Sequence, residues 1–375
     1  MHVSELTLVD FRSHRNVSID LTQGSTVFIG SNGQGKTNLV EAIDYLARMD
    51  SHRVSTDSPL VRMGAEYALV RTVVKRDDRE LQIEIEINPH KANRVRVNQN
   101  ALTRNRDLVG IVKTVVFSPE DLVLVKGDPS DRRRFLDQLV VMQIPRLTQT
   151  RADVDRILKQ RNALLKSARG RSGFDTNTLE IWDEHLARSG SELIAARLAL
   201  LDDFAPFLNE SYANVAALAA VHRRDVTAVY RSSVEEIAET RDADEIFHLL
   251  RDALRLNRSA ELDRGVTLVG PHRDDIVLSI GEMPAKGYAS HGEMWSLALA
   301  MRLASHALLR RDGDDPILIL DDVFAELDSG RRAQLAELVA DTEQVLITAA
   351  VAEDVPDVLS GTRFFVNDGV VSADE

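Results

Sequence analysis

Hydrophobic and polar residues alternate in short runs over the first hundred residues of the chain. The apolar segments HVSELTLVDF, NVSIDL and STVFIG come first, and each has the length of a single strand. Further alternating runs at 67–75, 81–87 and 94–97 predict a meander with one face open to solvent. Apolar side chains then recur three and four residues apart from Thr37 to about Arg48, which predicts a helix there.

The middle of the chain has a different pattern. Residues 129–257 are mostly of helical periodicity, and a glycine-containing stretch at 168–174 indicates a turn between helices. After Gly265 the strand pattern returns in VTLVG, DIVLSI, PILILDD and EQVLITAA. Helices are expected between these runs at about 291–311 and 330–340.

This order predicts one α/β domain interrupted by a helical insertion. We expect the first part of the α/β domain over 1–128, the insertion over 129–260 and the second part over 261–375. The insertion has no long heptad array, so it is expected to be a compact bundle and not an extended coiled coil.

Composition narrows the class of protein. The chain is 44% hydrophobic and 28% charged, as globular proteins are. It has no cysteine, no apolar run near the roughly 18 residues of a membrane span, and no signal-peptide pattern at its start. We therefore expect a cytoplasmic protein.

The net charge of −13 argues against nucleic acid as a partner, but the charge is unevenly distributed. Residues 131–171 hold 11 Lys and Arg against four Asp and Glu, a local charge of +7, and residues 90–106 hold five Lys and Arg and no acid. These islands are either solvated helix faces and a hairpin or a DNA-binding surface. The DNA candidates are Arg94, Arg96, Arg132, Arg133 and Arg134.

A phosphate-binding loop follows the segment STVFIG and precedes the first predicted helix. Its pattern G-x-x-x-x-G-K-[ST] is formed by Gly30, Ser31, Asn32, Gly33, Gln34, Gly35, Lys36 and Thr37. The glycines let backbone N–H groups surround the phosphates of a nucleotide. Lys36 is expected to reach the β- and γ-phosphates, and the Thr37 hydroxyl is expected on Mg²⁺.

The other half of the site consists of acidic residues and is expected far along the chain. The apolar run ILIL at 317–320 has the composition of a central parallel strand, and it ends in Asp321 and Asp322. Ligands bind at the carboxyl ends of such strands. Asp321 is expected to hold Mg²⁺, and Asp322 is expected to orient and deprotonate the attacking water.

A third motif, Ser290-His291-Gly292-Glu293, lies between these two. Ser290 and Glu293 have the spacing of a helix capping box. With the loop before it, the acidic pair after it and Glu326-Leu327-Asp328 beyond, the order resembles ABC-type ATPase heads. That resemblance implies that Ser290 and Gly292 bind the γ-phosphate held by a second subunit.

Longer blocks narrow this resemblance to the RecF family. They are LTLVDFRSHRNVSIDL, IGSNGQGKTNLVEAI, FSPEDLVLVKGDPSDRRRFLD, TLVGPHRDD and YASHGE with LALAMRLA. The resemblance implies an ABC-type P-loop ATPase head (lobe I) with an inserted, mostly helical second lobe (lobe II). It also places Asn38 beside ATP.

The same resemblance implies a function. It implies a weak, DNA-stimulated ATPase that uses ATP and Mg²⁺ and forms a homodimer on binding ATP. It further implies binding to double-stranded DNA and single-strand gap junctions, association with the nucleoid, and cooperation with RecR and RecO in loading RecA. The alternatives are an SMC-type head, a transporter ATPase subunit or a scaffold without hydrolysis.

The roles of several residues remain open from the sequence alone. Arg12 matches the family's early Phe-Arg pair and either approaches the nucleotide or lies on a strand surface. Thr348 occupies the place where many ABC ATPases have a γ-phosphate-sensing histidine, and FSPEDL is our choice for the glutamine-type loop. The polar cluster His272–Asp275 is either functional or a structural loop network.

Overall fold

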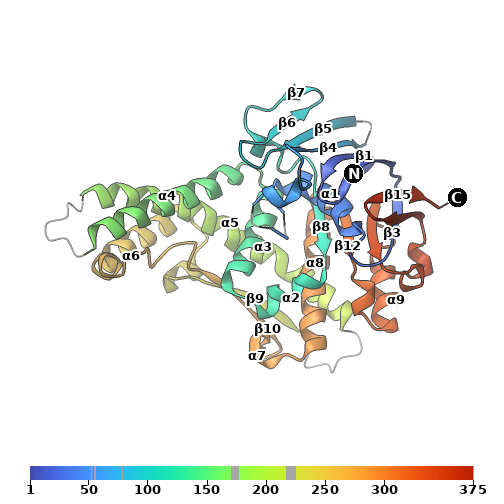
Figure 1. Ribbon diagram of the computed structural model, residues 1–375. Coiled ribbons are helices and arrows are strands. Elements are labelled where there is room, and N and C mark those ends of the chain that lie inside the picture. The colour runs from blue at the N-terminus through green and yellow to red at the C-terminus, as the bar shows by residue number, and fades with distance from the viewer. Residues whose placement is uncertain (52, 55, 78, 170–176, 217–224, 375) are drawn as a thin grey trace. The chain divides into compact units, whose positions relative to one another are not determined.

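The computed structural model describes residues 1–374 except 52, 55, 78, 170–176 and 217–224. Its contacts divide the chain into two compact units (Figure 1). We call Met1–Asp121 with Leu299–Glu375 the head unit, and Leu122–Ala298 the insertion unit.

The insertion unit is longer at both ends than the 129–260 expected from sequence. On the C-terminal side the reason is strand pairing, because β10 (Asp275–Ile280) pairs antiparallel with β9 (Val226–Arg231) inside the insertion. This pairing keeps residues after 260 in the insertion unit.

A six-stranded, mostly parallel sheet forms one layer of the head unit, in the order β15-β14-β3-β13-β12-β8. Its strands are β3 (Gly24–Ile29), β8 (Thr114–Phe117), β12 (Ile317–Asp321), β13 (Gln344–Ala349), β14 (Thr362–Asn367) and β15 (Val370–Ala373). β8, β12 and β13 are buried along their whole length, which explains why most of their residues are apolar.

A second, antiparallel sheet of the head unit has the order β2-β1-β4-β5-β6-β7. Its strands are β1 (His2–Phe11), β2 (His14–Asp20), β4 (Ala68–Arg76), β5 (Arg79–Ile87), β6 (Arg94–Val97) and β7 (Asn100–Ala101). The predicted meander is confirmed, because Ile83, Ile85 and Ile87 of β5 are buried while the residues between them are partly open to solvent.

Helix α1 (Lys36–Arg48) contributes to the core that both sheets share. Leu39, Val40, Ile43 and Leu46 belong to one buried cluster with residues of the antiparallel sheet and of β8, β12 and β13. The helix predicted from Thr37 is thus confirmed, with its apolar stripe in the core. The head unit also contains α9 (Ser329–Val339) and the second part of α8 (His291–Arg311).

The insertion unit is mainly helical, as expected, but contains a small sheet in the order β11-β10-β9. Its other elements are α2 (Leu122–Lys126), α3 (Pro129–Gln143), α4 (Leu147–Ala168), α5 (Asn177–Val215), α6 (Ala243–Arg264), β11 (Met283–Pro284), α7 (Ala285–Tyr288) and the start of α8. Strand β9 was not predicted, because its six residues lie in a helical stretch and its partner β10 is over forty residues away. The turn predicted at 168–174 lies mostly outside the described residues.

The strand predicted at VTLVG, residues 266–270, is wrong. These residues form a loop whose backbone is bound by side chains and, in the described part of the chain, has no strand partner. The N–H groups of Thr267 and Leu268 donate to Asn162 Oδ1 at 2.8 Å and to Glu261 Oε1 at 2.7 Å. Polar side chains therefore satisfy the backbone that a neighbouring strand was expected to satisfy.

None of the helices in the described part of the chain is both long and apolar enough to cross a membrane.

Candidate nucleotide-binding site

The phosphate-binding loop connects β3 to α1, as the sequence predicted. Gly30 has no room for a side chain, because a Cβ atom there would lie 2.2 Å from the carbonyl oxygen of Val366. Gly35 has φ of 109° and would bring a Cβ within 2.7 Å of Ser13 Oγ. Both glycines are therefore required by the backbone itself.

Two turns support this loop, and the sequence did not reveal either. His14, fully buried, lies with Nδ1 2.8 Å from the Gly369 carbonyl and Nε2 3.0 Å from the Gly35 carbonyl. The turn between β14 and β15 also donates from Asp368 N to Gln34 Oε1 at 2.6 Å and from Gly369 N to the Gln34 carbonyl at 3.1 Å. The loop is thus held from the start and the end of the chain.

Lys36 lies inside the curve of the loop. Its side chain is 3% exposed, and Nζ donates to the Gly30 carbonyl at 2.7 Å. Its Nζ also lies 3.8 Å from Asp322 Oδ1. An ammonium group in this position, at the N-terminus of α1, can contact the terminal phosphates of a nucleotide.

Thr37 and Asp321 are brought together although 284 residues separate them. Thr37 Oγ1 donates to Asp321 Oδ1 at 2.9 Å. Among the described residues no group of three or more His, Cys, Asp or Glu could hold a metal ion. A hydroxyl and one carboxylate fit Mg²⁺, which is commonly held by one or two protein oxygens together with phosphate and water.

Asp322 has an unusual backbone conformation, with φ of 51°. Such left-handed backbone is uncommon for residues other than glycine and persists where the surroundings enforce it. The buried hydroxyl of Thr348 supplies this constraint, since it accepts from Asp322 N at 2.9 Å and donates to Asp321 Oδ1 at 2.6 Å. Asp322 itself keeps a side chain that is 33% exposed.

Thr348 therefore holds the acidic pair. Its hydroxyl proton is used on Asp321, so it is not left to donate to a phosphate. The sequence left the γ-phosphate sensor open, and this geometry does not favour Thr348 for that role. Its role in positioning the two aspartates was missed, because the sequence does not show that β13 lies next to β12.

Arg12 forms an ion pair with a residue of α1. Its Nε and Nη2 donate to Glu41 at 2.9 and 2.6 Å, and Arg53 also contacts Glu41 at 3.0 Å. Burial favours a raised pKa for Glu41, but hydrogen bonds from Arg12 and Ser51 and the charges of Arg12 and Arg53 hold its pKa below the ordinary value. Arg12 thus orients the helix that follows the phosphate loop.

Asn38 belongs to the same polar group. Its amide nitrogen donates to Ser13 Oγ at 2.9 Å, and its amide oxygen accepts from Arg53 at 3.0 Å. The residue expected beside ATP therefore also connects α1 to the turn before β2.

FSPEDL, chosen as the glutamine-type loop, follows β8. Phe117 pairs in parallel register with Leu320, so Ser118 begins at the same sheet edge as Asp321. The loop is fixed by Asp121, which accepts from Ser118 N at 3.0 Å and pairs with Arg302. Its topological position agrees with the choice, which stays a prediction.

The capping box at the start of α8 is confirmed. Ser290 N donates to Glu293 Oε2 at 2.8 Å, and Glu293 N donates to Ser290 Oγ at 3.3 Å. Ser290 is exposed, Gly292 is partly exposed, and Trp295 is buried one turn later. Because the Ser290 oxygen accepts in this box, the hydroxyl proton remains for another partner.

The segment Glu326-Leu327-Asp328 ends as a helix cap. Asp328 accepts from Arg331 N at 3.0 Å at the start of α9, and Arg332 donates to the Leu327 carbonyl at 2.9 Å. The hydrogen bond from Arg331 N is the main reason that the pKa of Asp328 is lowered.

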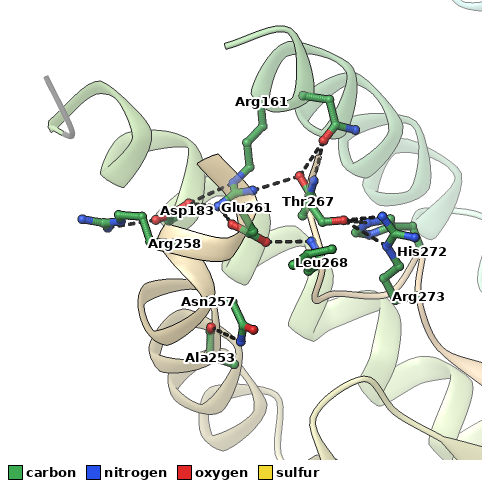
Figure 2. A network of polar contacts seen from close by, with 11 residues as sticks. Arg161, Asp183, Ala253, Asn257, Arg258, Glu261, Thr267, Leu268, His272 and Arg273 are labelled. Atoms are coloured by element: carbon green, nitrogen blue, oxygen red, sulfur yellow. Dashed lines mark hydrogen bonds and ion pairs between the residues drawn. The ribbon is translucent and has the colours of Figure 1, made fainter. Parts of the chain in front are cut away.

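The polar cluster at 272–275 is a structural network in the insertion unit. His272 and Arg273 both turn back to the Thr267 carbonyl, with Arg273 Nη2 at 2.6 Å (Figure 2). Asp274 accepts from Tyr230 Oη at 2.6 Å, and Asp275 accepts from Arg132 at 2.8 Å. Each of the four side chains is therefore engaged within the fold.

A buried charge group anchors the loop before this cluster. Arg161 of α4 is fully buried and donates to Asp183 of α5 at 2.7 Å and to Glu261 of α6 at 2.6 Å (Figure 2). Arg258 adds a second positive charge on Asp183 at 3.0 Å. Arg258 also donates to Glu180 at 3.0 Å, so three acids surround two arginines, and the group connects three helices without positive charge to spare for a ligand.

The DNA candidates differ in their surroundings. Arg132 is 4% exposed and bound to Asp275 through two nitrogens, so we remove it as a DNA contact. Arg94 and Arg96 on β6 are exposed, and Arg96 donates to Glu84 at 2.9 Å. Arg133 is partly exposed and Arg134 exposed on α3.

Comparison with known proteins places this geometry in a family. Residues 2–370 match the family model described as RecF/RecN/SMC N terminal domain. A DNA replication and repair protein RecF of Streptomyces avermitilis is 54% identical over 376 residues, covering 99% of each chain. One of Kineococcus radiotolerans, with the same name, is 56% identical over 384 residues, covering 96% of each.

Solved structures agree with the sequence comparison. The structure described as the recombination mediator protein RecF-ATP in the RecFOR pathway has a TM-score of 0.87 at 29% identity and covers 100% of this chain and 99% of that chain. An Smc head bound to the winged-helix domain of ScpA, at 17% identity and a TM-score of 0.55, shares the fold over 100% of this chain and 97% of its own. The predicted ABC-type ATPase head with a helical insertion is confirmed, and the chain belongs to the RecF family.

Proposed function

We propose that this protein is an ATP-switched DNA clamp of recombinational repair. It dimerises on ATP, marks gapped or ended DNA and helps RecO and RecR load the RecA recombinase, and slow hydrolysis resets it. The observation that carries the proposal is the hydrogen bond from Thr37 to Asp321, which joins the phosphate loop to the acidic strand end with Asp322 beside Lys36.

Within the head unit each residue has a distinct task. Backbone N–H groups of 30–38 and the Lys36 ammonium bind the phosphates of ATP. Asp322, exposed enough to meet solvent, orients a water molecule and accepts its proton. Thr37 and Asp321 would hold Mg²⁺, which when bound neutralises charge on the β- and γ-phosphates.

Ser290 and Gly292 act on the nucleotide of a second copy. The support is chemical, since an exposed helix N-terminus with a free hydroxyl proton suits an anion. Two sites of this kind, each completed by the other subunit, make dimerisation depend on ATP.

Relatives support the DNA part of the proposal. The curated relatives carry the name DNA replication and repair protein, and the similar solved structure is described as a recombination mediator in the RecFOR pathway. We accordingly place this chain in the cytoplasm at the nucleoid, with weak ATPase activity stimulated by DNA.

Sedimentation with gapped duplex DNA, with and without ATP and Mg²⁺, tests the proposal. We expect a dimer bound to DNA with ATP only, no ATP-dependent dimer for Lys36→Ala, and a persistent one for Asp322→Asn. If Asp322→Asn dissociates as fast as the parent in excess ATP, the assignment of the base is wrong. The alternative, an SMC-type head or an ABC-type ATPase that does not act on DNA, predicts ATP-dependent dimers that ignore gapped DNA.

A further inference from the structure

The insertion unit contains a polar pocket of about 230 Å³ between α3, α4, α5 and the loop at Pro271. Four arginines and two aspartates line it: Arg133, Arg134, Arg151, Arg197, Asp137 and Asp155. The nucleotide chemistry described above uses none of them. Their arrangement leaves more positive than negative charge around one cavity.

One pair in the pocket is neutral and structural. Arg197 and Asp137 are both buried and bind through two nitrogens and two oxygens, at 2.7 and 3.0 Å. Arg197 also donates to the Pro271 carbonyl at 2.7 Å. This buried pair lines the pocket and fixes the loop at Pro271.

The other three arginines have weaker partners. Arg133 donates to a backbone oxygen, that of Asp274, at 2.7 Å. Arg151 lies 3.8 Å from Asp137, which Arg197 already holds. Within the described residues Arg134 has no hydrogen bond or ion pair and is exposed. Asp155 and Asp137 share the pocket with these charges, and the charges of Asp274 and Asp275 also act on Arg133. Burial raises the pKa of the Asp155 carboxyl group.

A guanidinium group can donate two parallel hydrogen bonds to the oxygens of a phosphate. The excess of arginines over aspartates in the pocket therefore suits a phosphate ligand. Ser130, in the first turn of α3, adds an exposed hydroxyl donor to the lining. An anion placed here would relieve the repulsion among the three arginines and gain a site whose other walls are already fixed.

The surroundings indicate a polyanion. At about 100° per residue, Lys159 and Lys166 of α4 fall within roughly 80° of Arg151 on the same helix. Both lysines are exposed. A row of cations thus extends from the pocket along α4, over roughly 22 Å at about 1.5 Å per residue. A single phosphate would use the pocket alone, whereas a nucleic-acid backbone uses the whole row.

We propose that this pocket binds a backbone phosphate of DNA, with Arg133, Arg134 and Arg151 as its ligands and the α4 row continuing along the strand. The proposal rests on the proposed function and assigns it a contact surface. It also replaces Arg132, named from sequence, with Arg151, which lies 19 positions further along the chain.

The test is fluorescence anisotropy of labelled gapped duplex with the full chain and ATP at several salt concentrations. The variant R134A/R151A should bind roughly tenfold more weakly, and the slope of log affinity against log salt should fall by about 1 to 2. The matched control is R146A/R156A, which removes the same charge from exposed positions at α4 outside the pocket. It should bind within about twofold of the parent, because neither arginine belongs to the pocket or to the proposed α4 row.

A gain-of-affinity variant keeps the test independent of misfolding. Asp155→Asn removes the opposing carboxylate and should tighten DNA binding and steepen the salt dependence. The inference is overturned if R134A/R151A and its control bind alike, or if the pocket variants change binding of inorganic phosphate but not of DNA. Equal binding of polyglutamate would assign the pocket to an acidic protein partner. A parent chain that binds no DNA in any nucleotide state would overturn the proposed function as well.

Discussion

At the scale of single residues, Thr348 determines how the acidic pair of the candidate site is oriented. One hydroxyl contacts both members of the acidic pair, and it maintains Asp322 at a positive φ. Asp322 is thereby kept in a conformation in which its carboxylate is exposed next to Lys36. The geometry of the candidate site thus depends on a residue that need not touch the nucleotide.

We expect Thr348→Val to lower the ATP hydrolysis rate roughly ten- to hundredfold, because a hydrogen bond to a charged group is worth about 1.5–3 kcal/mol. ATP affinity should change little, since the phosphate loop stays intact. Single-turnover hydrolysis and nucleotide titration separate the two.

Thr26→Val is the control, because Thr26 Oγ1 is buried on β3 without a hydrogen-bond partner in the described structure. It should leave both quantities unchanged. Equal loss in the two variants would mean that valine disturbs the sheet itself.

His272 makes the stability of the folded protein depend on pH. Burial lowers the pKa of His272 from its ordinary 6.5 to about 4, while the hydrogen bond to Thr267 opposes this and the charge of Arg273 adds to it. The unfolded chain therefore binds a proton that the folded chain does not between these values. Stability from this residue is present above pH 6.5 and is lost as the pH falls towards 4.

From pH 6.5 to 5 the loss from His272 should reach about 1.5 kcal/mol. His272→Gln cannot titrate, so its free energy of unfolding should fall less over this range. Urea unfolding at each pH measures the difference, and His306, whose pKa is also lowered to about 4, is common to both proteins. Parallel curves for parent and variant would contradict this assignment.

At the scale of elements, the phosphate loop depends on two turns outside it, one of which lies more than 300 residues later in the chain. His14 begins β2, and Gly369 lies between β14 and β15, 355 residues later. His14 contacts both Gly369 and the loop carbonyl at Gly35. The conformation of the phosphate loop is therefore built by both sheets of the head unit.

We expect His14→Ala to weaken ATP binding several-fold, because it removes the buried imidazole between the Gly35 and Gly369 carbonyls, and the one hydrogen bond that a neutral imidazole can donate there is worth about 0.5–1.5 kcal/mol. Titration with a fluorescent ATP analogue checks this. His185→Ala, at an exposed position of α5, should bind as the parent does. An unchanged Kd for His14→Ala would show that the loop keeps its conformation without this support.

The element scale also shows where sequence patterns fail. The apolar run at 317–320 was predicted correctly as a parallel strand, because burial on both faces demands apolar residues at every position. VTLVG has a similar composition but forms a loop, since Asn162 and Glu261 satisfy its backbone. Composition alone could not separate the two, as the difference lies in which groups pack beside them.

At the scale of the whole molecule, the proposed dimer makes each site a product of two chains. A chain with Lys36→Ala lacks its own phosphate contact, and a chain with Ser290→Arg cannot complete its partner's site. Each variant alone should be inactive. Ser290→Arg should still bind ATP as a monomer.

Mixing the two variants should restore activity, because half of the dimers then contain one site with both residues intact. The expected rate is up to about a quarter of the parent's in a two-fold symmetric dimer. ATP hydrolysis by the mixture, compared with each variant alone at the same total concentration, measures it. A mixture as inactive as its components would argue that Ser290 acts within its own chain or only caps α8.

What the sequence by itself determined is local. The phosphate loop, the acidic pair after an apolar strand, the capping box at Ser290 and the meander are each specified within a few consecutive residues, because backbone geometry and alternation act over that range. The tertiary structure alone decided the partners of those residues. It assigned Thr348 to the acidic pair, His14 to the loop, Arg132 to a buried ion pair and Arg151 to an open pocket. The physical reason is that burial and pairing of a polar side chain depend on groups far away in the sequence, and an arginine has the same local pattern whether it ends beside an aspartate or faces solvent.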